Sequence, residues 1–223
     1  MRIGYPRTLG TGSTDSYPFN GVFTESIRVA GKDIRAGAVD ALVIWGGEDI
    51  SPSLYKHRTS SRTWAEDRPS TRDMVEMEVF HAARDVGIPI IGICRGAQLA
   101  CALSGGSLIQ HVNNHTGGNH GVVLDKGGSI KVTSCHHQMM YPFEVEHRMI
   151  GVAQTKLSRT YIGQDDEEIE FMHRDSTPEP EIVFFPKTNC LAIQGHPEFV
   201  GDMEHEFIKT TLDLTRKLMA KEL

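Results

Sequence analysis

The sequence predicts an α/β fold: one three-layer domain over residues 1–223, with a mostly parallel central sheet covered by helices and antiparallel strands at an edge. Three observations favour this class. Strand-like and helix-like segments alternate in the first half, as in proteins with parallel sheets. Short strand-like runs with few helical signals fill the second half, which is typical of antiparallel or edge strands. The length of 223 residues suits one domain with a substantial core.

The first half of the chain alternates predicted strands and helices. β-Branched runs bounded by Gly or Pro predict the strands. Ser70 or Thr71 can cap the first long helix, and Gly87 ends it. In chain order the expected elements are strands at 2–5 and 41–45, a helix between 71 and 87, a strand at 88–93 and a helix after residue 94.

The second half contains mostly short strand-like runs before a final helix. This helix is expected to start near Asp202, to pack an apolar stripe on the sheet and to fray over 217–223. The stretches 8–18 and 175–181 predict loops, and the acidic run 165–168 predicts a solvated loop. The expected strands are 121–124, 129–133, 149–153, 168–171, 182–185 and 190–194.

Composition narrows the function classes. The formal net charge is −6, so no basic surface for phosphate binding is evident and we expect no nucleic-acid partner. Residues 1–6 are too short and interrupted for a signal peptide, and no apolar run approaches membrane-spanning length. The four cysteines are scattered along the chain and form no Cys-x-x-Cys motif. This pattern is typical of proteins in a reducing compartment and does not indicate a disulfide framework. We therefore expect a cytoplasmic protein with no membrane partner.

Cys94 lies between an apolar strand and a predicted helix. Its flanking residues Gly92 and Gly96 permit a tight turn, as in the nucleophile elbow of Gly-x-Ser-x-Gly hydrolases. The free amides and the positive end of the helix dipole at such a corner favour a thiolate. The alternative is a buried, inert cysteine, which describes Cys101 and Cys190 better. Cys94 is therefore a candidate nucleophile.

A candidate base and a candidate carboxylate follow the carboxyl end of a second predicted strand. His196 follows the apolar run 190–193, and histidine can hold a thiol as thiolate and return a proton to a leaving amine. Glu198 lies two residues further on. Pro197 fixes φ between them, so the local backbone can hold both side chains in one geometry. Because the chain contains eleven histidines, the presence of one histidine is weak evidence for a catalytic base. The motif His-Pro-Glu at the end of a strand is more specific evidence.

A glycine pair marks the end of a third strand. Acyl transfer needs amide donors that point at the oxyanion, and Gly46-Gly47 lets the backbone turn an N–H into a cleft. We predict that the N–H of Gly47, or of Gly46, acts together with that of Arg95; the alternative is an ordinary Gly-Gly turn. Sites of open α/β sheets lie beyond the carboxyl ends of the strands, where all three signals fall.

These residues together resemble the class I glutamine amidotransferase superfamily, and most closely its γ-glutamyl hydrolase-like branch, peptidase family C26. The matching segments recur in family order from about residue 41 to residue 200. They are 46–55, 72–78, 92–99, 104–111, 134–138 and 194–198. The resemblance implies a flavodoxin-like three-layer domain, and we expect no cofactor.

The resemblance also implies roles for individual residues. It makes Cys94 the nucleophile, His196 the base and acid, and Glu198 the orienting carboxylate. Gln98 matches the family glutamine that contacts the glutamyl substrate. Segment 134–138 matches the family segment that borders the γ-glutamyl pocket. The residues expected to bind substrate are Gly46, Gln98, Ser134, Cys135 and His136.

Histidine-rich stretches raise the question of a metal. The run 135–137 reads Cys-His-His, but no second ligand cluster with zinc spacing appears, so we expect no metal site. His111, His115 and His120 lie in a stretch rich in Gly and Asn. We interpret these three as solvated loop residues.

The resemblance implies a cysteine hydrolase that cleaves a γ-glutamyl amide, in glutamine or in a γ-glutamyl amine or peptide, through a glutamyl thioester. One alternative is a glutaminase subunit that delivers ammonia to a separate synthetase. Another is a non-catalytic binding protein, although inactive relatives normally lack a triad residue and all three are present here. The expected partners are a small γ-glutamyl substrate and either a synthetase or a second copy in a homodimer.

Overall fold

Five parallel strands form one half of the central sheet. The computed structural model describes residues 1–8 and 16–223, so most of the predicted loop 8–18 lies outside the described residues. Within them the sheet has nine strands in the order β2-β1-β3-β4-β13-β12-β10-β7-β8. β3, β4 and β13 are buried throughout, as expected when helices cover both faces of a parallel sheet. The parallel strands are β1 (Arg2–Pro6), β2 (Glu25–Val29), β3 (Ala41–Ile44), β4 (Ile90–Ile93) and β13 (Cys190–Ile193).

Four antiparallel strands extend the sheet beyond β13. β12 pairs with β13 so that Ile182 lies opposite Ile193, and a register shift at Gly151 interrupts the pairing of β10 with β12. β8 alternates exposed and buried residues, as expected for an edge strand with one solvated face. The fold class predicted from the sequence is confirmed. The antiparallel strands are β12 (Pro180–Phe185), β10 (Arg148–Ala153), β7 (Asn119–Leu124) and β8 (Ser129–Thr133).

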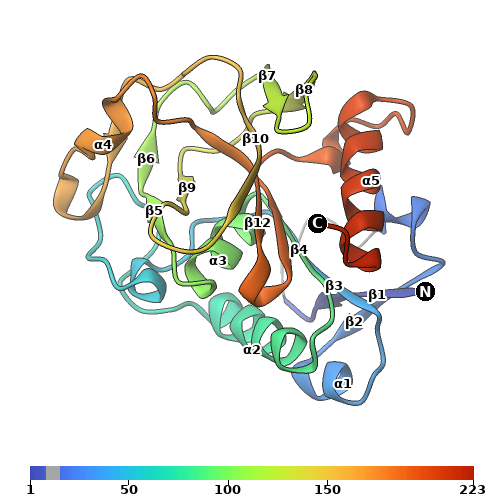
Figure 1. Ribbon diagram of the computed structural model, residues 1–223. Helices are drawn as coiled ribbons and strands as arrows, with labels where there is room; N and C mark the ends of the chain where they lie inside the picture. Colours follow the sequence, from blue (N-terminus) through green and yellow to red (C-terminus); the bar gives the residue numbers. More distant parts are fainter. Residues whose placement is uncertain (9–15) are drawn as a thin grey trace.

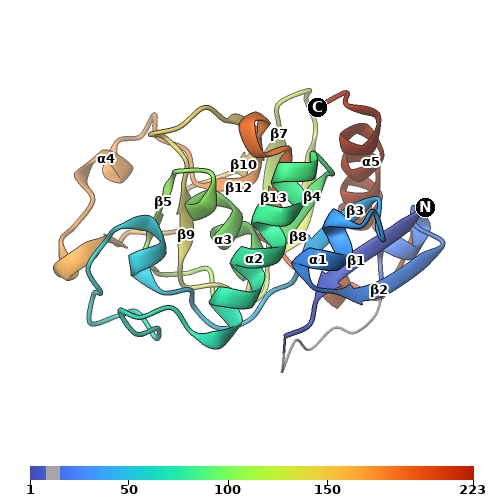
Figure 2. The same cartoon turned by 90° about the horizontal axis from the view of Figure 1, so that it is seen from below.

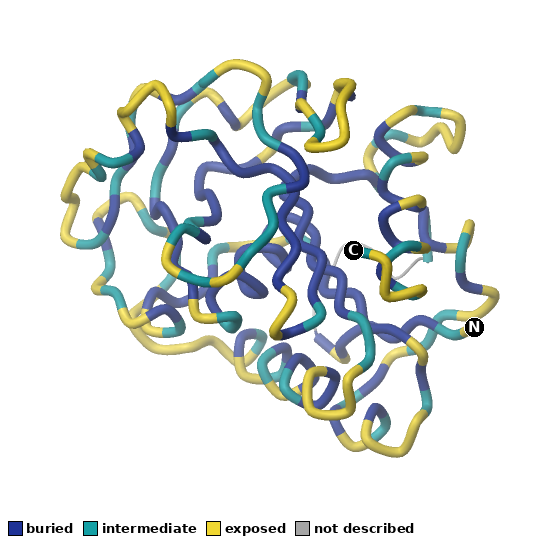
Figure 3. Tube along the Cα trace, in the orientation of Figure 1, coloured by how far each residue is buried: buried dark blue, intermediate teal, exposed yellow. Residues whose placement is uncertain are grey.

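Helices cover the two faces of the sheet (Figures 1 and 2). α1 (Gly31–Arg35), α2 (Thr71–Val86) and α3 (Arg95–Leu103) pack on one face, and α5 (Glu206–Ala220) packs on the other. Ser70 accepts a hydrogen bond from the Asp73 amide at the start of α2, and Gly87, with φ of 77°, ends this helix. The central strands are therefore buried along their length (Figure 3).

A smaller group of elements lies beside α3 and carries its own apolar cluster (Figure 1). The cluster contains Ile109, Val112, Met139, Tyr161 and Met172. Two pairs of short strands and one short helix surround it. They are β5 (Ser107–Ile109) with β9 (Met139–Tyr141), β6 (His111–Val112) with β11 (Tyr161–Ile162), and α4 (Glu170–His173). Short 3-10 helices elsewhere are Phe19–Gly21, Pro52–Tyr55, Gln164–Asp166, Pro186–Thr188 and Pro197–Phe199.

Three sequence predictions about secondary structure and loops need correction. The strand predicted at 168–171 is wrong, because its last two residues begin α4 and only Glu168 forms an isolated bridge, to Ile162. The loop predicted at 175–181 contains buried Glu179 and gives way to β12 at Pro180. The acidic run 165–168 is exposed at all four positions, as expected of a solvated loop, and Asp165 pairs with the exposed guanidinium of Arg58. The last helix starts at Glu206 and continues into the tail that was expected to fray.

Among the described helices, none combines the length and the apolar character needed to span a membrane.

Candidate active site

Cys94 occupies the corner between β4 and α3. Its backbone has φ of 50° and ψ of −108°, and its N–H donates to the carbonyl of Ile193 at 2.8 Å. Glycine is required on both sides of the corner. A Cβ at Gly96 would collide with the carbonyl of Ile44, and one at Gly92 would collide with the backbone of Gly96. The thiol is therefore held at a nucleophile elbow, with 5% of the residue exposed.

His196 and Glu198 lie just beyond the end of β13. The Nδ1 atom of His196 is 2.7 Å from Oε1 of Glu198, and the imidazole stacks on Phe199 with ring centroids 4.3 Å apart. Burial lowers the pKa of His196, but hydrogen bonds with Cys94 and Glu198 outweigh burial and raise this pKa to about 10. The geometry thus favours an imidazolium beside the thiol.

Gly46 and Thr133 hold the imidazole in place from two sides. A Cβ at Gly46 would lie 2.5 Å from Cε1 of His196 and 3.4 Å from Cβ of Cys94, so only glycine leaves room for the pair. On the other side, the His196 N–H donates to Oγ1 of Thr133 at 2.7 Å, and this hydroxyl donates to the His196 carbonyl at 3.0 Å. The structure therefore brings Cys94, His196, Glu198 and Gly46 together.

The predicted oxyanion donors follow two neighbouring strands, β4 and β3. The N–H of Arg95 belongs to the first turn of α3, where amides lack a helical partner, and Gly47 has φ of 155° after β3. The Arg95 guanidinium points away into the protein, where it pairs with Asp73 at 2.5 Å and with Glu76. Arg95 can therefore offer its backbone amide while its side chain anchors the corner.

Gln194 and Arg72 also support the corner, and sequence reasoning assigned neither a role. The Gln194 side chain is buried, and its Nε2 lies 3.8 Å from Sγ of Cys94. The Arg72 guanidinium donates to the carbonyls of Trp45 and Gly46 at 3.1 and 2.9 Å. Arg72 thereby fixes the backbone that precedes Gly47. Spacing could not reveal either contact, because both join segments far apart in the chain.

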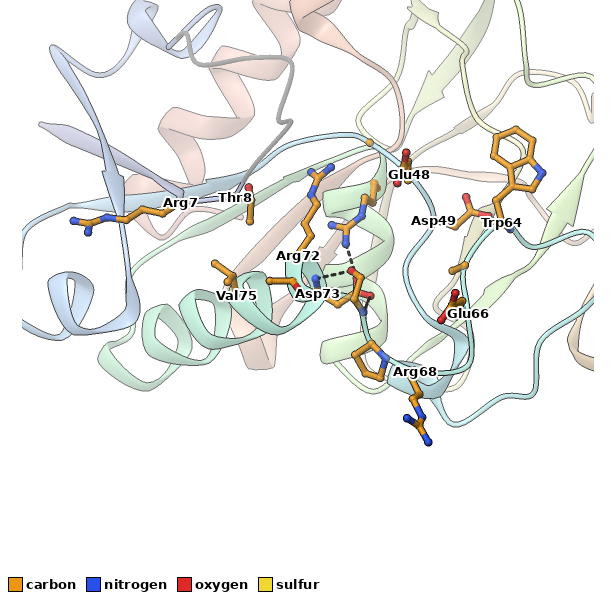
Figure 4. Close-up of a pocket in the computed structure, with 16 residues that line it drawn as sticks. Arg7, Thr8, Glu48, Asp49, Trp64, Glu66, Arg68, Arg72, Asp73 and Val75 are labelled. Carbon is orange, nitrogen blue, oxygen red and sulfur yellow. Dashed lines mark hydrogen bonds and ion pairs between the residues drawn. The ribbon is translucent and has the colours of Figure 1, made fainter.

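An open pocket of about 740 Å³ reaches from Gly47 to Trp64 (Figure 4). Trp64 is 77% exposed and stacks on His137 with ring centroids 4.0 Å apart. Asp49 connects the two, because one of its oxygens lies 2.9 Å from Nε2 of His137 and the other accepts from the Trp64 N–H. The pocket also contains Glu48, Glu66, Arg68 and Arg72. Polar groups of both charge signs therefore border the predicted oxyanion site.

The residues expected to bind substrate differ in their surroundings. The Gln98 side chain is buried and donates from Nε2 to the carbonyl of Gln138 at 3.1 Å. Ser134 is buried and donates to the carbonyl of His115 at 2.9 Å. His136 is buried as well, and burial lowers its pKa well below the ordinary value. Cys135, between them, is exposed. The side chains of Gln98 and Ser134 are thus engaged inside the protein.

The interpretation of three histidines as solvated loop residues is wrong for all of them, because each is buried or lies in a strand. His115 is fully buried, with Nε2 3.3 Å from Oε2 of Glu179. His120 lies in β7 with its Nε2 2.9 Å from Oε1 of Glu181, while His111 lies half-buried in β6. A stretch rich in Gly and Asn does suggest a loop, but the fold lays it against β12. The acidic partners on β12 could not be found from local sequence.

Comparison of the sequence with known proteins identifies relatives of this chain. The family model of peptidase C26 matches residues 31–198. The glutamine amidotransferase-like protein YvdE of Lactococcus lactis subsp. lactis (strain IL1403) is 27% identical over 189 residues, which cover 75% of this chain and 69% of that protein. A YvdE homologue of Lactococcus lactis subsp. cremoris is 31% identical over 122 residues, which cover 46% of this chain and 64% of that protein.

Solved structures share the fold. A glutamine amidotransferase from Thermotoga maritima aligns with a TM-score of 0.54 at 14% identity, over 99% of this chain and 89% of its own. The glutaminase domain of the Trypanosoma brucei CTPS, with bound acivicin, aligns with a TM-score of 0.55 at 14% identity, over 100% of this chain and 94% of its own. The family model covers most of the chain and the fold agrees. The chain therefore belongs to the peptidase C26 family, within the class I glutamine amidotransferase-like superfamily.

Proposed function

We propose that the protein hydrolyses a γ-glutamyl amide bond through a glutamyl thioester on Cys94. The observation that carries this proposal is the position of Cys94 at a strand-to-helix elbow, where Cys94 and an imidazole that Glu198 holds at 2.7 Å both pack against Gly46. This is the arrangement that activates a nucleophile: a base beside the thiol and a third group that orients the base.

Each step of the reaction has a residue to perform it. His196 holds the proton of the thiol before the attack, and Sγ of Cys94 forms a bond to the γ-carbonyl carbon as the carbonyl π electrons move to the oxygen. The amides of Gly47 and Arg95 stabilise the oxyanion. As the C–N bond breaks, His196 gives its proton to the leaving amine. Water then attacks the thioester while His196 accepts its proton, and glutamate and the free thiol are released.

The glutamyl part of the substrate is placed by segment 134–138 and Gln98. Gln98 lies one helical turn after the nucleophile, and its side chain bonds to the backbone of Gln138. This contact supports a role for Gln98 in shaping the pocket wall. The backbone groups of segment 134–138 and the backbone N–H of Gly46 are the proposed donors and acceptors. They would bind the ammonium and carboxylate groups of the glutamyl substrate.

A glutaminase subunit that feeds ammonia to a synthetase is the second candidate. It is favoured by similarity to the carbamoyl phosphate synthase small chain of Buchnera aphidicola, 27% identical over 122 residues, which cover 55% of this chain and 26% of that protein. The Ser-x-His-His-Gln segment at 134–138 favours the stand-alone hydrolase. For the stand-alone hydrolase, the proposed partner is a second copy in a homodimer. For the glutaminase subunit, the proposed partner is a separate synthetase.

A substrate panel tests the proposed function. The purified protein is assayed for glutamate release from glutamine, a γ-glutamyl polyamine, γ-glutamyl aminobutyrate and poly-γ-glutamyl folate. Cys94→Ala should release none, while Asp85→Asn, at an exposed ion pair on α2 outside the site, should retain wild-type rates. Turnover of glutamine alone would favour the ammonia-supplying subunit. Wild-type turnover by Cys94→Ala would overturn both candidates.

A further inference from the structure

Three buried side chains with metal-ligating atoms converge next to β12. His115 comes from the loop after β6, His136 from the segment between β8 and β9, and Glu181 from β12. At most 5% of each residue is exposed, and one ligand atom from each lies within 4.8 Å of the other two. The proposed triad uses none of these residues.

The hydrogen bonds of the two imidazoles determine which nitrogen of each ring is free. Nδ1 of His136 lies 2.8 Å from the carbonyl of Gln138, which can only accept, so Nδ1 carries the proton and the lone pair is on Nε2. That Nε2 is buried and has no hydrogen-bond partner. Nε2 of His115 lies 3.3 Å from Oε2 of Glu179, so this carboxylate receives the ring proton.

The free nitrogen of His115 faces the same space. Its Nδ1 lies 3.8 Å from Oε1 of Glu181 and 3.5 Å from the Ser134 hydroxyl, which donates instead to the His115 carbonyl. Imidazole ligands of metals typically donate their second N–H to a carboxylate or a carbonyl, which fixes the tautomer. Both rings have such a partner here, Glu179 for one and the Gln138 carbonyl for the other.

The charge in this cluster also favours a cation. Glu179 and Glu181 are both 1% exposed, and in the described part of the chain neither forms an ion pair with lysine or arginine. Oε2 of Glu181 is buried without a partner, whereas Oε1 lies 2.9 Å from His120. Two imidazole nitrogens and one carboxylate oxygen are a donor set that zinc accepts.

We propose that Nδ1 of His115, Nε2 of His136 and a carboxylate oxygen of Glu181 form a zinc site. Tetrahedral zinc ligands lie about 3.4 Å apart, so the three groups need to contract by about 1 Å on binding. The ion would join segment 134–138 to β12. Zinc spacing was not visible in the sequence, because the three ligands come from separate segments.

Metal titration of the full chain tests this site. The protein is freed of metal with a chelator and titrated with Zn²⁺ and Co²⁺, as wild type and as the double variant Cys94→Ala, Cys135→Ala. One equivalent should bind to both forms. The cobalt form should show d–d absorption without a thiolate charge-transfer band, and zinc should raise the unfolding temperature. Absence of stoichiometric binding, or a thiolate band from the wild type that the double variant loses, would overturn the assignment.

Ligand variants give a second, independent test. Glu181→Gln and His136→Asn should each weaken zinc binding at least tenfold, because each removes one of three ligands. His147→Asn is the matched control, because His147 bonds to the carbonyl of Val145 outside the cluster, and it should bind zinc as the wild type does. Wild-type affinity in both ligand variants would refute the site. If a ligand variant fails to fold, the cobalt spectrum of the wild type decides.

Discussion

Nδ1 of His196 lies 2.7 Å from Oε1 of Glu198, and the single residue between them is Pro197. The proline fixes φ at that position, so a short segment of backbone presents the proposed base and its proposed orienting acid together. The ring is also stacked on Phe199 and held at its backbone by Thr133. Four side chains thus determine which face of the imidazole reaches Cys94.

Glu198→Gln should lower kcat on the order of 10²–10⁴-fold, because the amide cannot stabilise the imidazolium and allows the wrong tautomer. The substitution is isosteric, so the circular dichroism spectrum should not change. Steady-state kinetics on the substrate identified in the panel measure the effect. A kcat equal to the wild-type value would show that Glu198 does not orient the base.

Gly46→Ala should reduce kcat/KM by about 10²-fold or more, because the new Cβ would lie 2.5 Å from Cε1 of His196 and displace the ring. The matched control is Gly117→Ala, since a Cβ at Gly117 meets no atom within 4 Å. That variant should retain wild-type kinetics. Equal effects of the two alanines would contradict the close packing of Gly46 on the imidazole.

His196 should remain protonated well above neutral pH. Its pKa is raised to about 10 by hydrogen bonds with Cys94 and Glu198 that outweigh burial. In Cys94→Ala one of these partners is lost, so the pKa should fall. NMR titration of the His196 Cε1–H resonance in the wild type and in Cys94→Ala measures both values. An unshifted pKa in the variant would mean that the thiol does not interact with the ring.

The same pKa shift predicts how stability depends on pH. Because the folded-state pKa is raised above the ordinary value of 6.5, the bound proton stabilises the folded protein. This contribution is fully present below pH 6.5, decreases as the pH rises from there, and is lost above about pH 10. Urea unfolding across this range, with His196→Gln as the reference, isolates the effect. A difference between the two proteins that does not change with pH would contradict it.

The four cysteines should react with iodoacetamide in two groups. Burial raises the pKa of Cys101 to about 12 and also raises the pKa of Cys190, so both should stay unmodified near neutral pH. Cys94, beside the imidazolium, and the exposed Cys135 should be alkylated. Peptide mass spectrometry of the folded protein identifies the sites. Loss of activity should follow the labelling of Cys94.

Asp73→Asn should destabilise the fold by about 3–5 kcal/mol, because it leaves the buried guanidinium of Arg95 without one of its two carboxylate partners. The control is Asp85→Asn at the exposed pair with Arg84, which should leave the free energy of unfolding nearly unchanged. Chemical denaturation measures both. Similar small losses for the two variants would indicate that Glu76 alone compensates Arg95.

Much of the parallel half of the sheet could be predicted from the sequence because its strands are continuous apolar runs. β3 and β4 are buried on both faces, so their composition alone identifies them. β2 has the sequence Glu-Ser-Ile-Arg-Val at a sheet edge and gives no such signal. α4 was mistaken for a strand because Ile169 and Phe171 alternate with acidic residues, a pattern that fits a strand as well as a single helical turn.

The candidate site was predictable in part for a related reason. Cys94 follows β4 directly, and Gly46 and His196 lie within three residues of the ends of β3 and β13. The carboxyl ends of neighbouring parallel strands meet in space. The buried state of His115 could not be predicted, because it depends on contacts with Glu179 and Glu181 that form only when β12 is in place. Long-range pairing of polar groups has no local sequence signal.

The backbone of Cys94, with φ of 50° and ψ of −108°, also bears on the history of the chain. A residue with a side chain pays about 1–3 kcal/mol to adopt such a conformation, whereas glycine does so more readily. A lineage released from the need for a thiol would gain stability by drifting to glycine here. A cysteine in this conformation therefore costs folding stability, and the proposed chemistry of its thiol gives a reason for that cost.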